Sequence, residues 1–330
     1  MNRFEVVRPA DLPNAVRLLA QPGHIALAGG VDVLDLLKQQ IVAPRTLVDL
    51  KGLKELDGIS ISPDGGLRLG ALARLSDVAA AGPVREHFTA VAEGAGEAAT
   101  PQIRNLGTVG GNLLQRPRCW YFRNPDIQCL KKGGRICYAL NGLNRYHAIL
   151  GGSPSFIVHP SNLALPLVAH GASVRLIGPG GERIVVLDQF FSLPSIDPTR
   201  ENILRPGEIL VEVTVPRPPA NARSTYMEVR EKQSFDWPLV SVAAMLVIDP
   251  RSRMVRDSRV VLGAVAPIPW RSREAEQVLS GAILNRKRAA DAADAALKDA
   301  RPLPHNAYKV PIAKALVRRA VLRAGGVEDT

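Results

Sequence analysis

The sequence lacks any apolar run approaching the roughly 18 residues that cross a membrane. It begins MNRFEVVRPADLPNA, with no apolar segment after its arginine, so we expect no signal peptide of its own. Its three cysteines cannot all pair, which argues against a disulfide scaffold. Aromatic residues make up only 5% of the chain, and no helix-turn-helix, RNA-recognition or zinc-finger pattern is present. No acid–base triad or nucleophile stands out, so no catalytic residue is predicted.

Positive charge is plentiful, with 42 basic residues against 31 acidic ones among 330. Between Arg116 and Arg145, seven Lys or Arg residues stand against the single acid Asp126. An acidic partner, an anionic cofactor or an anionic cluster would each neutralise this segment. The basic excess in residues 217–330 is more typical of scattered solubilising charge. RNA binding through the basic loop is a competing hypothesis that rests on charge alone.

The order of the predicted elements indicates an α+β protein with domains at residues 1–55, 56–216 and 217–330. The first has the order strand–helix–strand–helix–strand, which predicts a small parallel sheet. The second mixes short strands with helices, and the third has antiparallel strands followed by three helices. Trp237 and Trp270 in the third domain are expected in the core or at a domain contact. Strands are predicted at residues 4–7, 25–28, 46–50, 67–69, 156–158, 173–177, 183–187, 209–215, 225–230, 240–248 and 259–265.

Two glycine-containing turns could each bind an anion. In the first, an apolar strand passes through Gly29 and Gly30 into a helix, where backbone N–H groups can face a phosphate. The second turn lies in residues 104–112 and contains three glycines, two Asn and a Thr. Neither is the G-x-G-x-x-G fingerprint. The two turns either hold the two phosphates of one diphosphate or are unrelated tight turns.

The cysteines are Cys119, Cys129 and Cys137, all within nineteen residues of one another. Prolines and a Gly133-Gly134 pair predict an irregular loop between them, of the kind that carries iron–sulfur clusters or zinc. The spacings match neither a ferredoxin nor a C-x-x-C knuckle. Three possibilities remain open. The loop holds an iron–sulfur cluster stabilised by the surrounding positive charge, or a Cys₃His zinc site completed by His147, or no metal at all.

Five motifs along the chain are AGGVDVLDLLK, IRNLGTVGGNLLQ, HPSNLALPL, SFDWPLVSVAAML and LGAVAPIPWR. Together they resemble the flavin-binding subunits of the xanthine dehydrogenase (molybdenum hydroxylase) family. The resemblance extends over almost the whole chain. The insertion RCWYFRNPDIQCLKKGGRIC, followed by NRYHAILGG, is similar to the bacterial periplasmic aldehyde oxidoreductases, whose flavin subunit carries an additional [4Fe-4S] cluster.

The resemblance implies a fold with a small βαβ FAD-binding domain, a mixed α/β domain sharing the FAD cleft and a C-terminal domain of a sheet and helices. It also implies that this chain binds FAD through its two glycine turns and the HPSN motif. The implied FAD-binding residues are Ala28, Gly29, Gly30, Val31, Asp32, Val33, Leu34, Asn105, Thr108, Gly110, Gly111, Asn112, His159, Ser161 and Asn162.

The resemblance assigns the cluster to an insertion at residues 116–147, with Cys119, Cys129, Cys137 and Ser155 as candidate ligands. Cluster-bearing relatives have a fourth cysteine where Ser155 stands, so the alternatives to its hydroxyl are His147, Asp126, an external ligand or the loss of one iron. A second departure is Asn162, where relatives carry Asp. Asn keeps one acceptor but removes a negative charge beside the flavin.

The implied function is that of an electron-transfer subunit in a heterotrimeric molybdenum-containing aldehyde or N-heterocycle dehydrogenase. A large molybdopterin subunit and a small [2Fe-2S] subunit would be its partners, and an external acceptor would take the electrons from FAD. The alternative is a self-contained FAD-dependent reductase using NAD(P)H. We expect a cytoplasmic protein, or a periplasmic one exported together with a signal-bearing partner.

Overall fold

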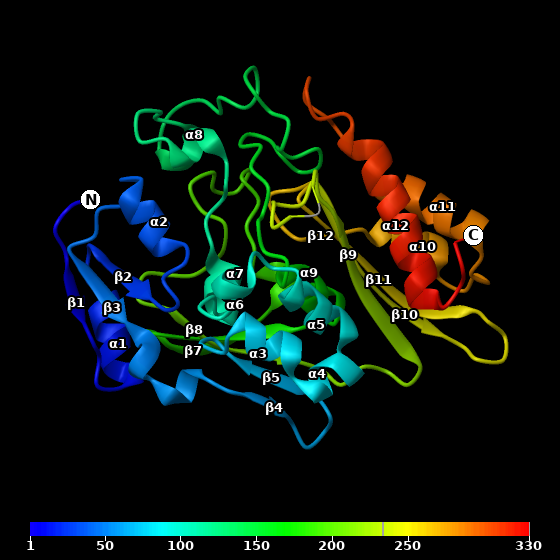
Figure 1. The fold of residues 1–330 in the computed structure, drawn as a ribbon, viewed down its shortest axis with the longest axis horizontal. Helices are drawn as coiled ribbons and strands as arrows, with labels where there is room; N and C mark the ends of the chain where they lie inside the picture. Colours follow the sequence, from blue (N-terminus) through cyan, green and yellow to red (C-terminus); the bar gives the residue numbers. More distant parts are fainter. Residues whose placement is uncertain (233, 330) are drawn as a thin grey trace.

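A computed structural model describes residues 1–232 and 234–329 of the chain. Three separate sheets organise the molecule, with the N-terminal sheet at the left of Figure 1, the second at its lower centre and the third at its right. A long irregular segment that carries α8 lies at the top, away from all three sheets. Among the described residues no helix has the length and apolar character needed to span a bilayer.

The first sheet is parallel, with strand order β1-β3-β2, as predicted from the alternation of strands and helices. Asp11 caps the first helix by accepting a hydrogen bond from Asn14 N at 2.7 Å. The second strand ends at Leu27, one residue earlier than predicted, which leaves the following glycines wholly within the turn. The elements are β1 (Glu5–Val7), α1 (Leu12–Leu19), β2 (His24–Leu27), α2 (Val33–Lys38) and β3 (Thr46–Asp49).

The second sheet has five antiparallel strands in the order β4-β5-β8-β6-β7. Gly178 pairs with Gly181 across a two-residue turn, and Gly181 has a φ of 98°, a conformation that suits glycine. The strands are β4 (Ile59–Ile61), β5 (Leu67–Gly70), β6 (Ser173–Gly178), β7 (Gly181–Val186) and β8 (Ile209–Val215).

The prediction of a strand at residues 156–158 is wrong. Phe156 O accepts from Ala148 N, and His159 N donates to Ala266 O, but this segment joins no sheet. It runs without regular secondary structure from the end of the insertion to α9. An apolar run alone could not distinguish such a connection from a buried strand.

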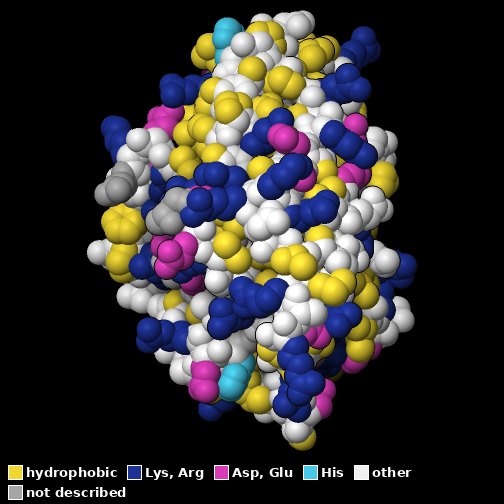
Figure 2. Space-filling model, turned by 90° about the vertical axis from the view of Figure 1, so that its right-hand side faces the viewer, with side chains coloured by type: hydrophobic (Ala, Val, Ile, Leu, Met, Phe, Trp, Pro, Cys, Tyr) yellow, Lys and Arg dark blue, Asp and Glu magenta, His cyan; other side chains and the backbone are white. Residues whose placement is uncertain are grey.

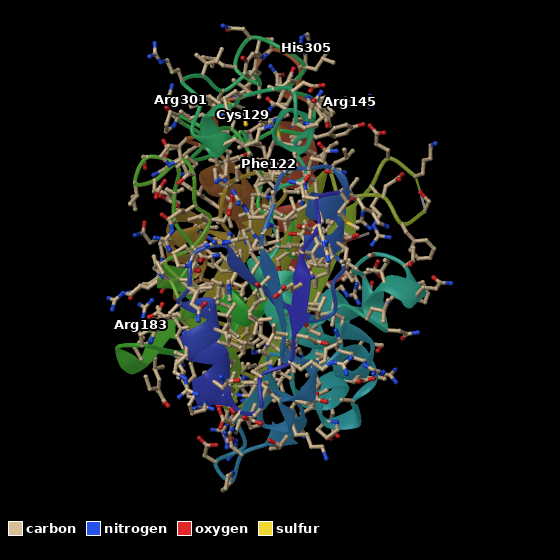
Figure 3. All side chains as sticks on the ribbon, turned by 90° about the vertical axis from the view of Figure 1, so that its left-hand side faces the viewer. Phe122, Cys129, Arg145, Arg183, Arg301 and His305 are labelled. Atoms are coloured by element: carbon tan, nitrogen blue, oxygen red, sulfur yellow. The ribbon has the colours of Figure 1, made fainter. Side chains whose placement is uncertain are left out.

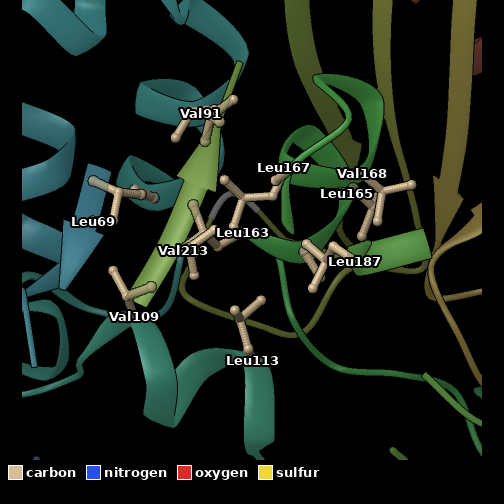
Figure 4. Packing of buried hydrophobic residues seen from close by; sticks show 14 of the residues in the cluster. Leu69, Val91, Val109, Leu113, Leu163, Leu165, Leu167, Val168, Leu187 and Val213 are labelled. Carbon is tan, nitrogen blue, oxygen red and sulfur yellow. The ribbon is translucent and has the colours of Figure 1, made fainter. Parts of the chain in front are cut away.

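Helices of the middle part pack on the second sheet and enclose the largest apolar cluster. Figure 4 shows Leu163 beside Val213 of this sheet, and Leu69, Leu165 and Leu167 belong to the same cluster. All of these side chains are almost wholly buried, which stabilises the fold by the hydrophobic effect. The helices are α3 (Leu75–Ala80), α4 (Gly82–His87), α5 (Thr89–Gly96), α6 (Pro101–Arg104), α7 (Val109–Leu114) and α9 (Ala164–Ala169).

The third sheet is antiparallel, with strand order β12-β11-β10-β9. α12 packs against one side of this sheet, while α5 and α9 contact it from the middle part. Lys and Arg side chains spread over the outer face, with apolar and acidic side chains between them (Figure 2). The elements are β9 (Ala222–Val229), β10 (Val240–Ile248), β11 (Val255–Gly263), β12 (Trp270–Arg271), α10 (Arg273–Leu279), α11 (Arg286–Ala296) and α12 (Lys309–Gly325).

The predicted insertion is irregular, and its longest regular piece is the four-residue helix α8 (Trp120–Arg123). Its C-terminal end is attached to the last helix by Lys309, which is 1% exposed. The Lys309 ammonium donates to Tyr146 O at 3.0 Å and to Ala264 O at 2.7 Å. Among the described residues no carboxylate pairs with it, so burial lowers the pKa of Lys309 to about 7.

This buried lysine predicts a pH-dependent stability. The unfolded chain holds the Lys309 proton up to about pH 10.4, whereas the folded chain releases it near 7. The cost of burying the charge is therefore fully present below pH 7 and is relieved as the pH rises. Relative to Lys309→Met, the wild type should gain up to about 2–3 kcal/mol of unfolding free energy between pH 7 and 9.

Chemical denaturation at several pH values measures this difference. Lys314→Met, which removes an exposed lysine from the same helix, is the matched control. A constant difference between wild type and Lys309→Met across this range would contradict the assignment of a buried ammonium.

Candidate functional site

The first glycine turn connects β2 to α2 and has several free donors. Gly30 has a φ of 78°, which turns the chain sharply after Gly29. Among the described residues, the N–H groups of Gly29, Gly30, Val31 and Asp32 donate no hydrogen bond. Successive free amides in such a turn form a concave site for an anion. This turn therefore has the properties that the sequence predicted for it.

The second turn leads into α7 and uses most of its amides internally. Thr108 caps the helix, and its hydroxyl accepts from Gly111 N at 3.1 Å. Gly110 N donates to Ala71 O at 2.8 Å. These two glycine amides are therefore not free donors, contrary to the expectation from the sequence. The side-chain Nδ2 of Asn112 donates no hydrogen bond within the described chain, so it is available to a ligand.

The two turns touch each other through Gly29. A Cβ atom at position 29 would lie 1.9 Å from the Leu106 carbonyl oxygen, closer than any real contact. Only glycine permits this approach of the two backbones. Because the contact joins the first sheet to the middle part, it brings the two turns to one site.

A cavity of about 540 Å³ lies between the two turns. Its volume falls within the range of about 300–1,000 Å³ that is usual for ligand and cofactor sites. A second cavity of about 350 Å³ adjoins it toward the insertion. Arg118, Asn162 and Trp237 line both cavities, so the two are neighbouring parts of one site.

The structure brings most of the predicted FAD-binding residues to these cavities. Leu34 and Asn105 are exceptions, because both side chains are exposed and line neither cavity. The first cavity is lined by Ala28, Gly29, Gly30, Val31, Asp32, Val33, Thr108, Gly110, Gly111, Asn112 and Asn162. The second is lined by His159, Ser161 and Asn162.

The HPSN motif attaches the second turn to α9. Ser161 Oγ donates to Asn112 Oδ1 at 2.5 Å and accepts from Ala164 N at 2.9 Å. His159 lies beneath them with 3% exposure, and its ring stands edge-on to Phe191 at 4.5 Å. Burial lowers the pKa of His159 to about 3, so the imidazole is neutral at physiological pH.

Asp32 has a role that the sequence did not predict. Its carboxylate accepts from the backbone N of Arg116 at 2.8 Å, from Arg118 at 2.9 Å and from Arg123 at 2.7 Å. The side chain of Arg123 is only 8% exposed and also pairs with Asp35 at 2.9 Å. Asp32 thus anchors the insertion to the first turn.

The positive charge of the insertion is largely neutralised by acids from elsewhere in the chain. Arg116 and Lys131 both pair with Glu201, at 2.8 and 2.6 Å, and Arg145 pairs with Glu231. With Arg118 and Arg123, five of the basic residues are in ion pairs. These basic residues therefore hold the insertion in place through ion pairs. The net positive charge left to stabilise an anionic cluster is much smaller than the sequence suggested.

Trp237 is the clearest site residue that the sequence analysis missed. Of the two predicted places, the core is wrong, because the side chain is 47% exposed, whereas the contact between domains is found; the sequence did not predict that Trp237 also lines both cavities. The Arg118 guanidinium lies over its ring, 4.8 Å from the centroid. The motif SFDWPL supplied a signal, but only the folded chain places it beside Arg118. Trp270, by contrast, packs against the core of the third sheet, as predicted.

All three cysteines are unpaired thiols in the insertion. Figure 3 places Cys129 beside Phe122 at the top of the view, and Cys119 packs against the same small apolar cluster. His147 Nε2 lies 3.2 Å from Cys119 Sγ. Burial raises the pKa of the Cys119 thiol to about 12, and the neighbouring Cys137 and Cys129 add to the rise.

The arrangement of the possible metal ligands tests the zinc site that the sequence left open. Among the described residues no three His, Cys, Asp or Glu side chains are arranged to hold a single metal ion. The Cys₃His zinc site therefore has no support from the geometry. Ser155 is 1% exposed. Its neighbour Phe156 accepts a hydrogen bond through its carbonyl oxygen from Ala148 N, and Ala148 directly follows His147 in the chain.

Fold and site together define a class of protein. One turn has free amides, a glycine contact joins it to the other turn, and two adjoining cavities lie beside them; this arrangement fits a dinucleotide with its diphosphate at the turns. The chain also matches the FAD-binding domain of molybdopterin dehydrogenases over residues 2–218 and the C-terminal domain of CO dehydrogenase flavoproteins over residues 224–324.

Known proteins match along nearly the full length. The aldehyde oxidoreductase FAD-binding subunit PaoB of Escherichia coli is 38% identical over 92% of this chain and 93% of its own length. The carbon monoxide dehydrogenase medium chain of Hydrogenophaga pseudoflava is 28% identical over 97% and 96%. The chain belongs to the FAD-binding electron-transfer subunits of the xanthine dehydrogenase (molybdenum hydroxylase) family.

Solved structures agree on the fold. A carbon monoxide dehydrogenase structure from Hydrogenophaga pseudoflava has a TM-score of 0.78 and 26% identity over 98% of both chains. Quinoline 2-oxidoreductase from Pseudomonas putida, at 24% identity, has a TM-score of 0.76. The predicted flavin-subunit fold is thus confirmed, and the alternative of an independent NAD(P)H-dependent reductase receives no support.

The contact between the turns makes a direct prediction. Gly29→Ala should separate the turns, since the new methyl group would overlap Leu106 O. We expect FAD affinity to fall about tenfold or more, equivalent to about 1.4 kcal/mol or more. The flavin content and FAD titration of the purified chain measure this effect.

Gly52→Ala is the matched control, because a Cβ at position 52 would meet nothing within 4 Å. If Gly29→Ala and Gly52→Ala bound FAD with equal affinity, the contact between the turns would have no part in FAD binding.

Proposed function

We propose that this chain is the FAD-binding subunit of a molybdenum-dependent aldehyde oxidoreductase. The observation that carries this assignment is the full-length similarity to the PaoB subunit of an aldehyde oxidoreductase, at 38% identity. The carbon monoxide dehydrogenase and xanthine dehydrogenase relatives are 28% and 27% identical. The wider class of aldehyde or N-heterocycle substrates is therefore narrowed to aldehydes.

In this proposal the chain works with a large molybdopterin subunit and a small [2Fe-2S] subunit. The organic substrate is converted on the large subunit, which agrees with the lack of a predicted catalytic residue on this chain. When bound, FAD can accept and release electrons one at a time or in pairs. An external acceptor completes the electron path.

The residues of this chain bind and orient the nucleotide. The free amides of residues 29–32 receive the diphosphate, and Asn112 Nδ2 adds a donor from the second turn. Arg118 and Arg123 neutralise the Asp32 carboxylate, so that it does not repel the phosphates. Trp237 and Asn162 line the part of the cavity that remains for the flavin.

We further propose that the insertion holds an iron–sulfur cluster of the [4Fe-4S] type, with Cys119, Cys129 and Cys137 as ligands and Ser155 as the fourth. The proposal is supported by three unpaired thiols in the insertion and by the buried hydroxyl of Ser155, which follows it in the chain. Such a cluster would supply one-electron transfer. His147, which contacts Cys119, is the alternative fourth ligand.

The cysteines and the serine can be tested together. Anaerobically prepared wild-type chain, made with iron and riboflavin in excess, should contain about four iron atoms and matching sulfide. Cys129→Ser should lose most of this iron and keep its FAD. Ser155→Cys should retain iron longer in air, because a thiol deprotonates far more readily than an alcohol.

His147→Ala separates the two possible fourth ligands. Loss of iron in this variant, with no change in Ser155→Ala, would assign the position to His147. Wild-type chain with bound FAD but no iron would contradict the cluster and leave FAD binding intact.

A further inference from the structure

Asn162 lies at the boundary of the two cavities, and its amide is held in one orientation. The side chain is 5% exposed and precedes α9. Its Nδ2 donates to Tyr226 Oη at 3.0 Å and to Glu228 Oε2 at 2.8 Å. A carboxylate oxygen can only accept, so the nitrogen of the Asn162 amide must face Glu228.

The acceptor atom of Asn162 therefore faces the other way. Among the described residues no group donates to Asn162 Oδ1, yet this oxygen is not sealed inside the protein. Since Asn162 lines both cavities, its oxygen is presented there as a hydrogen-bond acceptor.

Glu228 is itself fixed on both sides. Its Oε2 accepts from Tyr226 Oη at 2.5 Å, and Arg230 contacts its Oε1. Arg230 also reaches Glu97 at 2.8 Å. The side chain of Glu228 is only 5% exposed, so protein encloses these hydrogen bonds and water does not compete for the carboxylate.

We propose that Glu228 is a positioning residue for flavin binding: it holds Asn162 Oδ1 toward the cavity as the acceptor for a hydroxyl or ring N–H of the flavin half of FAD. The inference rests on FAD binding by this chain. In this chain the residue at position 162 is an amide, and the carboxylate of Glu228 on β9 lies directly behind it.

The chemistry of the variants follows from the bonds. In Glu228→Gln, Arg230 retains the oxygen of the new amide, which leaves its amino group facing Asn162. Two amino groups cannot bond each other, so Asn162 turns its oxygen inward and presents a donor to the flavin. In Asn162→Asp, two carboxylates meet at hydrogen-bond distance and repel.

The double variant Asn162→Asp with Glu228→Gln exchanges the two groups. The amide introduced at position 228 then donates to the carboxylate introduced at position 162, whose second oxygen again faces the cavity as an acceptor. We expect each single variant to bind FAD at least about tenfold more weakly than wild type. The double variant should return to within about threefold of wild type, which simple loss of a structural residue would not produce.

The test is a titration of the full-length, deflavinated chain with FAD and, separately, with ADP in competition. ADP lacks the flavin half, so its affinity should be unchanged in all variants. Glu97→Gln is the matched control, because it removes a carboxylate from Arg230 without contacting Asn162.

Three outcomes would overturn the inference. Single variants that bind FAD like wild type would show that the orientation of Asn162 is irrelevant. Parallel losses of FAD and ADP affinity, without recovery in the double variant, would assign Glu228 a purely structural role. A wild-type chain that binds ADP but not FAD would refute the flavin contact, whereas binding of neither would refute FAD binding by the chain itself.

Discussion

The site depends on one close approach of two backbones. Gly29 and the Leu106 carbonyl are separated by a distance that leaves no room for a Cβ atom. Through this contact the small parallel sheet, which supplies the free amides, is joined to the middle part, which supplies the opposite wall of the cavity. Neither part encloses a dinucleotide alone. Because the contact is between main-chain atoms, it defines the distance between the turns without relying on flexible side chains.

A second connection joins this site to the insertion. Asp32 follows the free amides directly, and its carboxylate binds Arg116 N, Arg118 and Arg123. Removing one member of this ion-pair group destabilises the arrangement, because the remaining charges lose their partners while they stay partly shielded from water. The same residue thus ends the anion-binding turn and holds the cysteine-containing segment beside the cavity. A flavin site and a thiol-rich insertion are thereby kept in a fixed relation.

The local pattern of residues was enough to predict the parallel sheet and the strands at 209–215 and 240–248, because each depends on neighbouring residues. The glycines indicated the two turns as anion sites, and the family resemblance added their assignment to FAD. What sequence could not provide were contacts between distant positions. The partners of Asp32 lie more than 80 residues away, and those of Asn162 more than 60. Likewise, Trp237 could be assigned to the cavity only once Arg118 was placed over its ring.

A crystal structure of the chain loaded with FAD tests the central claim most directly. The account predicts the diphosphate within hydrogen-bond distance of the amides of Gly29, Gly30 and Val31, with Gly29 still against Leu106 and the flavin extending toward Asn162 and Trp237. A diphosphate bound elsewhere, or a cavity opened by separation of the two turns, would contradict it.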